Sequence, residues 1–216
     1  MKLVSKFLEF LFPDQNLCVV CGRPRAPLCA SCYERVLSLQ THRVRLVAGV
    51  GRVMALLPYE GEMRRRIHNM KFGSQPHLAR LFARALRHSK LLESSPVDVV
   101  TAVPMHRSRY IQRGYNQADL LAQELAREQG IPYRELLVRV KNTLPQHTLS
   151  RLARQTNQDG AFHVAADPKD LRVLLVDDVL TTGNTVRACK EALEVAGARE
   201  VVVVVLAMAL PRSNKY

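Results

Sequence analysis

The sequence lacks any hydrophobic run long enough to cross a bilayer as a helix. Such a helix needs roughly 20 apolar residues, and no stretch of the 216 residues approaches this, although 47% of them are hydrophobic. Internal repeats and low-complexity tracts are also missing. The length suits one α/β domain with a proper core and a small appendage of a few dozen residues.

Acidic residues are scarce. The chain has 19 Asp and Glu against 32 Lys and Arg, which gives a net charge of +13 and a sequence pI of about 10.0. This excess favours a polyanionic partner, and nucleic acid is the first candidate. A small ligand rich in phosphate also needs basic residues, and many basic proteins are merely solvated, so charge alone does not decide.

The N-terminus lacks the small-residue cleavage site of a signal peptide. Lys6 and Glu9 interrupt its apolar run, and Leu3, Phe7 and Leu11 share one face at helical spacing. The pattern predicts a short amphipathic helix, either docked on the protein or lying on a membrane surface. Without an export signal we expect a cytosolic protein.

Histidine motifs are missing too. None of the seven histidines forms an H-x-x-x-H pair or another ligand spacing, so all are read as structural or surface residues. The isolated Cys189 lies in a predicted helix and is most simply a small core residue.

The other four cysteines form two C-x-x-C pairs, Cys18 with Cys21 and Cys29 with Cys32, seven residues apart. Each two-residue spacer lets both sulfurs of a pair point at one metal, so the pattern predicts a structural, four-coordinate zinc ion. Disulfides are the alternative, which a cytosolic compartment disfavours. We assign residues 1–40 to an N-terminal helix and this four-cysteine zinc module.

Predicted strands and helices alternate over residues 41–216, which indicates an α/β fold with a parallel sheet covered on both sides. Strands are predicted at residues 45–48, 53–57, 97–103, 136–140, 173–176 and 201–206. Helices are predicted at residues 62–70, 76–91 and 116–128, and from the Thr/Gly-rich segment to residue 196.

An acidic turn follows the predicted strand at residues 173–176. Asp177 and Asp178 come first, and the Thr/Gly-rich segment 181–185 then offers hydroxyls and backbone amides that can wrap a phosphate at the start of the next helix. Two adjacent carboxylates would repel such an anion unless they bind sugar hydroxyls or hold Mg²⁺. The pattern therefore favours a ligand with ribose, phosphate and pyrophosphate, although a receiver-like α/β protein can also end a strand in two acids.

This turn resembles the phosphoribosyl pyrophosphate (PRPP) loop of type I phosphoribosyltransferases. The resemblance implies that Asp177 and Asp178 meet the ribose hydroxyls, with Mg²⁺ bound directly or through ribose or water, and that the later residues line the 5′-phosphate. The PRPP-binding residues predicted in this way are Asp177, Asp178, Val179, Thr181, Thr182, Gly183, Asn184 and Thr185.

In that fold a pyrophosphate loop follows an earlier strand. The matching segment here comprises Pro104, Met105, His106 and Arg107. Arg107 is then a pyrophosphate contact, although a solvated loop is the competing interpretation, and Lys71 could equally serve pyrophosphate.

Several further motifs resemble the ComF family of competence proteins. They are the cysteine pairs, Tyr59-Glu60-Gly61, Met70-Lys71-Phe72-Gly73, Val103-Pro104-Met105-His106-Arg107 and Arg113-Gly114-Tyr115-Asn116-Gln117-Ala118. The resemblance covers nearly the whole chain. It implies a cytosolic protein of natural transformation that binds PRPP and helps imported single-stranded DNA towards recombination, together with uptake or recombination proteins.

Basic residues with aromatic neighbours mark candidate DNA contacts, because cations track the backbone of a single strand while aromatic faces stack on its bases. The predicted contacts are Arg64, Arg65, Arg66, Arg109, Arg113 and Tyr115. A solvated helix face over residues 64–66 and a core role for Tyr115 are the alternatives.

An active, Mg²⁺-dependent phosphoribosyltransferase that acts on a nucleobase or another nitrogen acceptor is the enzymatic alternative. It would use the same pocket, with residues 141–158 as a lid that excludes water. No recognisable element identifies a nucleobase, so no general base is assigned.

Overall fold

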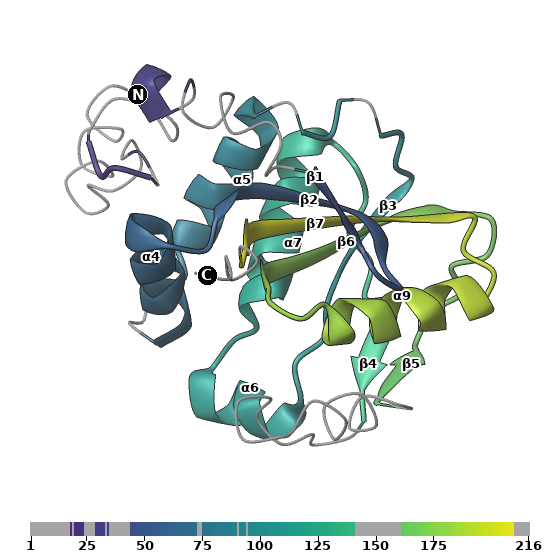
Figure 1. Cartoon of the computed structure of the whole chain (residues 1–216). Coiled ribbons are helices and arrows are strands. Elements are labelled where there is room, and N and C mark those ends of the chain that lie inside the picture. The colour runs from purple at the N-terminus through teal and green to yellow at the C-terminus, as the bar shows by residue number, and fades with distance from the viewer. Residues whose placement is uncertain are drawn as a thin grey trace, which may run out of the picture.

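A five-stranded sheet forms the centre of the molecule (Figure 1), with the strand order β1-β2-β7-β6-β3. The computed structural model describes residues 18, 20–23, 29–32, 34, 44–72, 75–89, 91–93, 95–140 and 161–209. The predicted N-terminal helix and the predicted lid at residues 141–158 lie outside these residues.

The sheet is parallel except at one edge. Its strands are β1 (Val44–Val47), β2 (Gly51–Pro58), β3 (Val99–Ala102), β6 (Arg172–Leu180) and β7 (Glu200–Met208). β1 and β2, which match the strands predicted at residues 45–48 and 53–57, pair antiparallel, and all other pairs of this sheet are parallel. The central strands are runs of Val and Leu because both of their faces are buried.

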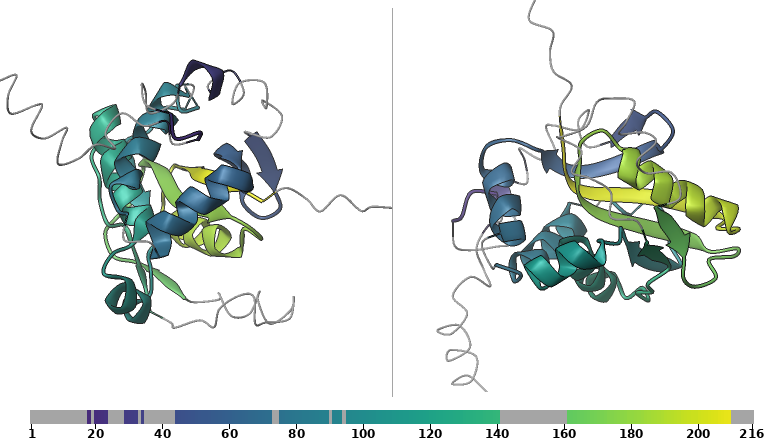
Figure 2. Two further views of the ribbon diagram at one scale, coloured as in Figure 1. Left: turned by 90° about the vertical axis from the view of Figure 1, so that its left-hand side faces the viewer. Right: turned by 90° about the horizontal axis from the view of Figure 1, so that it is seen from below.

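Helices cover both faces of the sheet, as the alternating pattern predicted. The helices α4 (Gly61–Phe72), α5 (Leu78–His88) and α7 (Gln117–Gln129) share one hydrophobic cluster with one face, whereas α9 (Asn184–Val195) packs in a second cluster on the other face. Figure 2 shows the sheet between these two layers. In the part of the chain that the structure describes, no helix combines the length and apolar character of a membrane span.

The ends of α7 follow from local sequence. The Asn116 side chain accepts a hydrogen bond from the Ala118 amide at 3.2 Å, and Gly130 ends the helix with a left-handed φ of 68°. These are common capping arrangements, because Asn satisfies a free amide and Gly adopts positive φ without a steric cost. The predicted helix at residues 116–128 is therefore confirmed almost to the residue.

Two elements were not predicted. The helix α6 (Arg107–Arg113) buries no residue, so its sequence has no apolar period to reveal it. His106 is its N-cap residue, and the ring Nδ1 of His106 accepts a hydrogen bond from the Ser108 amide at 3.2 Å. Gly114 is its C-cap residue. The strand β5 (Phe162–Val164) is only three residues long and forms a small antiparallel sheet with β4 (Leu137–Arg139).

Candidate functional site

The acidic pair lies inside strand β6 and not in a turn after it. β6 continues four residues beyond the predicted end at residue 176, because β7 remains paired with it as far as Leu180 and Met208. Its other neighbour, β3, stops pairing at Ala102 and Val176. Asp177 and Asp178 therefore occupy a part of β6 that has a partner strand on only one side.

Successive side chains of a strand point to opposite faces of its sheet, and the two acids accordingly have different neighbours. Asp178 is 8% exposed and forms an ion pair with Lys71 at 2.9 Å, from the last turn of α4. Burial lowers the pKa of Lys71, but the charge and hydrogen bond of Asp178 outweigh this, so its pKa is raised. Lys71 stays cationic, and the site holds a fixed ion pair.

Asp177 is half-buried on the other face of β6. Its Oδ1 accepts the Asp178 amide at 2.8 Å. Burial raises the pKa of Asp177 to about 7, and the negative charge of Asp178 adds to the effect, while Lys71 and Arg139 act against it. Strongly shifted carboxyl groups cluster at functional sites, and near neutral pH a bound cation would drive this one into its charged form.

The Thr/Gly-rich turn leads directly into α9. Gly183 is the N-cap residue of α9 with φ 81°, and it contributes no side chain to cap the helix. A Cβ at this position would lie 3.1 Å from Val47 Cγ1, so both the backbone angle and the neighbouring strand favour glycine. The first amides of α9 have no partner within the helix and form a potential anion site beside exposed Thr181 and Thr182.

The other predicted members of this site surround the same turn. Val179 is half-buried in β6, next to the acidic pair, and Asn184 and Thr185 are half-buried in the first turn of α9. The predicted PRPP-binding residues thus run from the end of β6 through the turn to the first turn of α9, and all lie at the carboxyl end of β6.

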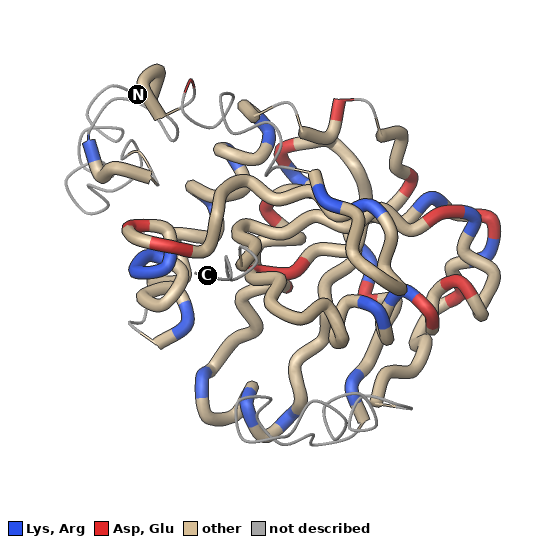
Figure 3. Tube along the Cα trace, viewed as in Figure 1, with Lys and Arg blue, Asp and Glu red and all other residues tan. Residues whose placement is uncertain are grey.

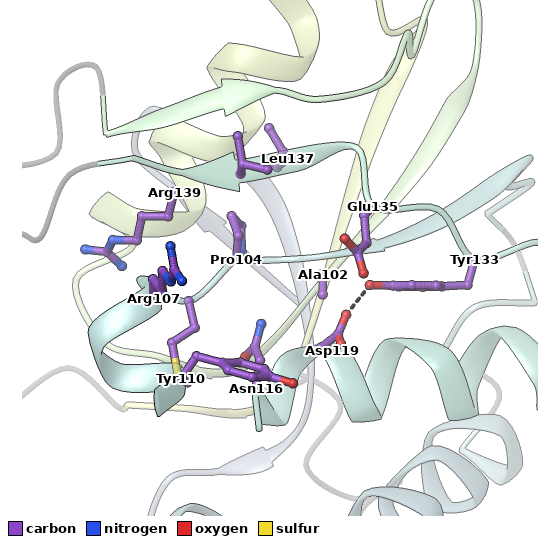
Figure 4. A pocket seen from close by; sticks show the side chains of 12 residues that line it. Ala102, Pro104, Arg107, Tyr110, Asn116, Asp119, Tyr133, Glu135, Leu137 and Arg139 are labelled. Atoms are coloured by element: carbon purple, nitrogen blue, oxygen red, sulfur yellow. Dashed lines mark hydrogen bonds between the residues drawn. The ribbon is translucent and has the colours of Figure 1, made fainter. Parts of the chain in front are cut away.

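The predicted pyrophosphate loop follows β3, which is the neighbour of β6. The Val103 amide donates to the Val176 carbonyl at 2.9 Å and ties the start of the loop to β6. His106 caps α6, and Arg107 is exposed at the start of that helix. Pro104, Met105 and Arg107 line a cavity of about 420 Å³ (Figure 4), and neither acid of the pair belongs to its lining.

The predicted DNA contacts fall into two groups on different helices (Figure 3). In α4, Arg64 and Arg65 are exposed and Arg66 is half-buried. Both Arg65 and Arg66 form ion pairs with Glu62, the second at 2.9 Å. Their position leaves an exposed positive face on α4.

The second group lies on and after α6 and is partly engaged within the protein. The guanidinium of Arg113 lies 4.6 Å from the ring centre of Phe72, and the Tyr115 hydroxyl donates to the Met70 carbonyl. Arg109 is half-buried. These contacts join the end of α4 to the α6–α7 linker.

The four cysteines of the N-terminal pairs come together. Their sulfur atoms lie within 4.8 Å of one another, with Cys21 and Cys29 3.7 Å apart, and the Cys29 amide donates to Cys18 Sγ at 3.5 Å. The hydroxyl of Ser31 is the main cause that lowers the pKa of Cys29 to about 6. This cluster, completed by Cys32, could hold a metal ion.

Sequence reasoning missed the residues opposite the loop in the 420 Å³ cavity. Asp119, Tyr133, Glu135 and Arg139 come from α7, from the connection after it and from β4, and they line this cavity with Arg107. They share no motif, and their proximity depends on how α7 and β4 pack beside β3. Only the polarity of the segment at residues 133–139 hinted at them.

Comparison with known proteins gives concordant matches. Residues 112–215 match the family described as "Phosphoribosyl transferase domain". The DNA utilization protein YhgH of Salmonella typhimurium is 30% identical over 197 residues, which cover 87% of this chain and 82% of that protein.

Two competence proteins match as well. Competence protein F of Haemophilus influenzae is 39% identical over 137 residues, covering 61% of this chain and 60% of that protein. Competence protein ComFC of Streptococcus pneumoniae is 28% identical over 211 residues, covering 93% of each.

Proposed function

Because the chain belongs to the ComF family of competence and DNA utilization proteins, we propose that it binds PRPP and assists the handling of imported single-stranded DNA in the cytosol. The observation that carries the PRPP part is the combination found at the carboxyl end of β6. There a buried carboxylate paired with a lysine is followed, after the end of β6 and the Thr/Gly-rich turn, by a helix N-terminus without a side-chain cap. Ligands of parallel α/β sheets bind at this edge.

Each part of PRPP has a suitable group at this site. The first amides of α9, with Thr181 and Thr182, suit the 5′-phosphate, because amides and a helix N-terminus favour a phosphate. Asp178 suits the ribose hydroxyls, which donate hydrogen bonds to a carboxylate. Lys71 is a nearby cation for the pyrophosphate, as is Arg107 from the loop after β3.

Mg²⁺ fits the donor set. It prefers carboxylate and phosphate oxygens and keeps several waters, so one or two acids on β6 together with the pyrophosphate would suffice. With its pKa raised to about 7, Asp177 is only partly charged at neutral pH, and a bound cation would favour its charged form. We therefore assign Mg²⁺ to the bound PRPP and not to a permanent protein site.

Zinc fits the cysteine cluster. Four thiolates about 2.3 Å from a tetrahedral zinc ion are roughly 3.8 Å apart, and the Cys21 and Cys29 sulfurs are separated by 3.7 Å. We propose a structural ion in the module at residues 1–40, followed by the phosphoribosyltransferase-like domain at residues 41–216.

The DNA part of the proposal is supported by the names of the relatives and by charge. A net charge of +13, with exposed arginines on α4 and α6, favours a polyanion, and such binding should weaken steeply as salt rises. Phe72 and Tyr110 are exposed beside these arginines and offer faces for base stacking. Protein partners would belong to the uptake or recombination machinery.

The test is calorimetric titration with PRPP and Mg²⁺. The variant with Asp177→Asn and Asp178→Asn should lose binding by more than tenfold, because it lacks both the hydroxyl acceptors and the metal ligands. Asp167→Asn, on an exposed loop, is the matched control and should bind as the unaltered protein does. Unchanged binding by the double variant would refute the site. Pyrophosphate release with any base would instead support the enzymatic alternative.

A further inference from the structure

The cavity of about 420 Å³ lies beside the open edge of the sheet, between β3, α6, α7 and the segment that leads into β4 (Figure 4). It shares Arg107 with the loop after β3, but Asp177, Asp178 and the Thr/Gly-rich turn are not among its lining residues. Its size falls in the usual range of small-molecule sites, about 300–1,000 Å³. The PRPP proposal gives this space no ligand.

The two ends of the cavity carry opposite charges. Figure 4 shows Arg107 and Arg139 together at one end, and Asp119, Glu135 and the Tyr133 hydroxyl at the other. Arg139 also lies over the ring of Phe162, with its guanidinium 5.1 Å from the ring centre. Paired arginines are well suited to a phosphate, which they can bind through several hydrogen bonds.

The carboxylates at the acidic end can accept further hydrogen bonds from a ligand. The Tyr133 hydroxyl donates to Asp119 Oδ1, and Gln123 Nε2 donates to Asp119 Oδ2 at 3.2 Å. Since a carboxylate has about four acceptor sites, each oxygen of Asp119 can take another donor. Glu135 is exposed and forms no hydrogen bond or ion pair with the residues that the structure describes. A ligand that reaches this end must therefore present N–H or O–H donors.

Between the charged ends the walls are mainly apolar or aromatic, and the polar side chain there, Asn116, is already hydrogen-bonded to the Val103 carbonyl and the Ala118 amide. Pro104 and Leu137 line one part of the cavity, and the ring of Tyr110, which is half-exposed, lines another. An aromatic ring offers a stacking face for a planar base. The cavity thus presents a cationic end, a flat apolar middle and an end that accepts hydrogen bonds.

We propose that this cavity binds one nucleotide, with its phosphate at Arg107 and Arg139 and the donor groups of its base at Asp119 and Glu135. Guanine fits best, because its adjacent N1–H and amino group can both donate to one carboxylate. Thymine has one ring N–H and two carbonyl oxygens, which would face the carboxylates unfavourably. The nucleotide is either free or part of a single strand, and in the second case the inference rests on the proposed DNA function.

A free amino acid is the other ligand with one cationic and one anionic group. Its ammonium and carboxylate are attached to the same carbon atom, however, whereas the acidic and basic groups of the cavity stand at opposite ends. Glutamine, the amino acid used in the test below, also has no ring to stack on the aromatic wall. The cavity therefore favours a nucleotide.

The experiment measures binding of 5′-dGMP, 5′-dTMP and free glutamine to the full chain by calorimetry. We expect dGMP to bind at least tenfold more tightly than dTMP, and Glu135→Gln to remove most of this difference, because an amide presents N–H groups where the base needs acceptors. Arg139→Gln should weaken both nucleotides. Glu200→Gln, another exposed acid on a distant strand end, is the matched control and should change neither.

Two further measurements distinguish a free nucleotide from one that belongs to DNA, and the nucleotide site from the PRPP site. A thymidine oligonucleotide with one central dG should compete with dGMP better than the all-thymidine strand if the nucleotide belongs to DNA, and equal competition would indicate a free nucleotide. The variant with Asp177→Asn and Asp178→Asn should keep its dGMP binding even though it loses PRPP, so the two proposals can fail separately. Equal affinities for dGMP and dTMP, no effect of Glu135→Gln, or binding of glutamine instead of dGMP would overturn the nucleotide site.

Discussion

At the scale of single residues, Asp177 and Asp178 are neighbours in sequence but differ in environment. Asp178 forms an ion pair with a lysine, while Asp177 has a pKa of about 7 because burial and a neighbouring negative charge both disfavour its charged form. The sequence predicted both residues as members of the site, because their position after an apolar strand is visible in the chain. Their different environments depend on the face to which each side chain points, and this follows from the paired length of β6.

The first prediction concerns the pH dependence of stability. The usual carboxyl pKa of 3.8 applies to Asp177 in the unfolded chain, and folding raises this pKa to about 7. Between these values Asp177 binds more protons in the folded protein, so the contribution of Asp177 to the free energy of unfolding falls as pH rises from about 4 to 7 and levels off above. The raised pKa of Lys71 acts only in the alkaline range.

Asn cannot ionise, so Asp177→Asn should remove the loss of stability that accompanies ionisation of Asp177 between about pH 4 and 7. We expect the variant to be more stable at pH 8, by about 2 kcal/mol, and nearly unchanged at pH 4, as measured by urea unfolding at both pH values. Asp167→Asn is the control for a lost exposed charge. A gain of equal size at pH 4 and pH 8 would show that relief of Asp177 ionisation is not the cause.

At the scale of elements, the cysteine cluster is packed against α4. Cys18, Val20 and Cys32 are almost fully buried and belong to the same hydrophobic cluster as Met63 and Ile67 of that helix. Spacing alone predicted the cluster, because two C-x-x-C pairs bring their sulfurs together whatever surrounds them. The packing on α4 was not predicted, since nothing in a local motif shows which helix will cover it.

This packing links metal binding to the stability of the domain. Purified protein should carry about one zinc ion per chain, and Cys29→Ser should lose it. Because Cys18 and Cys32 are buried in the same hydrophobic cluster as the apolar face of α4, we expect the variant to be less stable by about 2 kcal/mol. This corresponds to a melting temperature lower by roughly 5 °C.

Metal analysis and calorimetric melting provide the check. Cys189→Ala alters a buried cysteine of α9, which packs on the other face of the sheet, and the variant should retain the zinc. Metal-free wild-type protein that melts at the same temperature as the zinc-bound form would contradict the link between the ion and α4.

Elements without a periodic apolar pattern were not predicted from the sequence. α6 buries no residue and β5 is three residues long, so neither has the periodicity by which helices and strands are recognised. β6 was predicted too short because two acids resemble the end of a strand, and only the partner β7 keeps them in it. The buried strands β2 and β7 and the capped helix α7, in contrast, were predicted within two residues of their observed ends, because their signals are local.

At the scale of the whole molecule, two neighbouring polar sites lie near the carboxyl ends of β3 and β6. One is the acidic pair with Lys71 and the start of α9, and the other is the cavity beside α6 and α7. The loop after β3 supplies Arg107 to the lining of the second, and the PRPP proposal offers the same residue to the pyrophosphate at the first. The fold class follows from the alternation of strands and helices, but the juxtaposition of these sites follows from the strand order, which no local pattern determines.

The central claim is that a phosphorylated ribose binds at the carboxyl end of β6. A crystal structure determined with PRPP and Mg²⁺ tests it most directly. We predict density for the 5′-phosphate at the first amides of α9 and for the ribose hydroxyls at Asp178, with Lys71 near the pyrophosphate. Crystals that hold PRPP elsewhere, or that leave residues 177–185 without it at saturating concentration, would contradict the account.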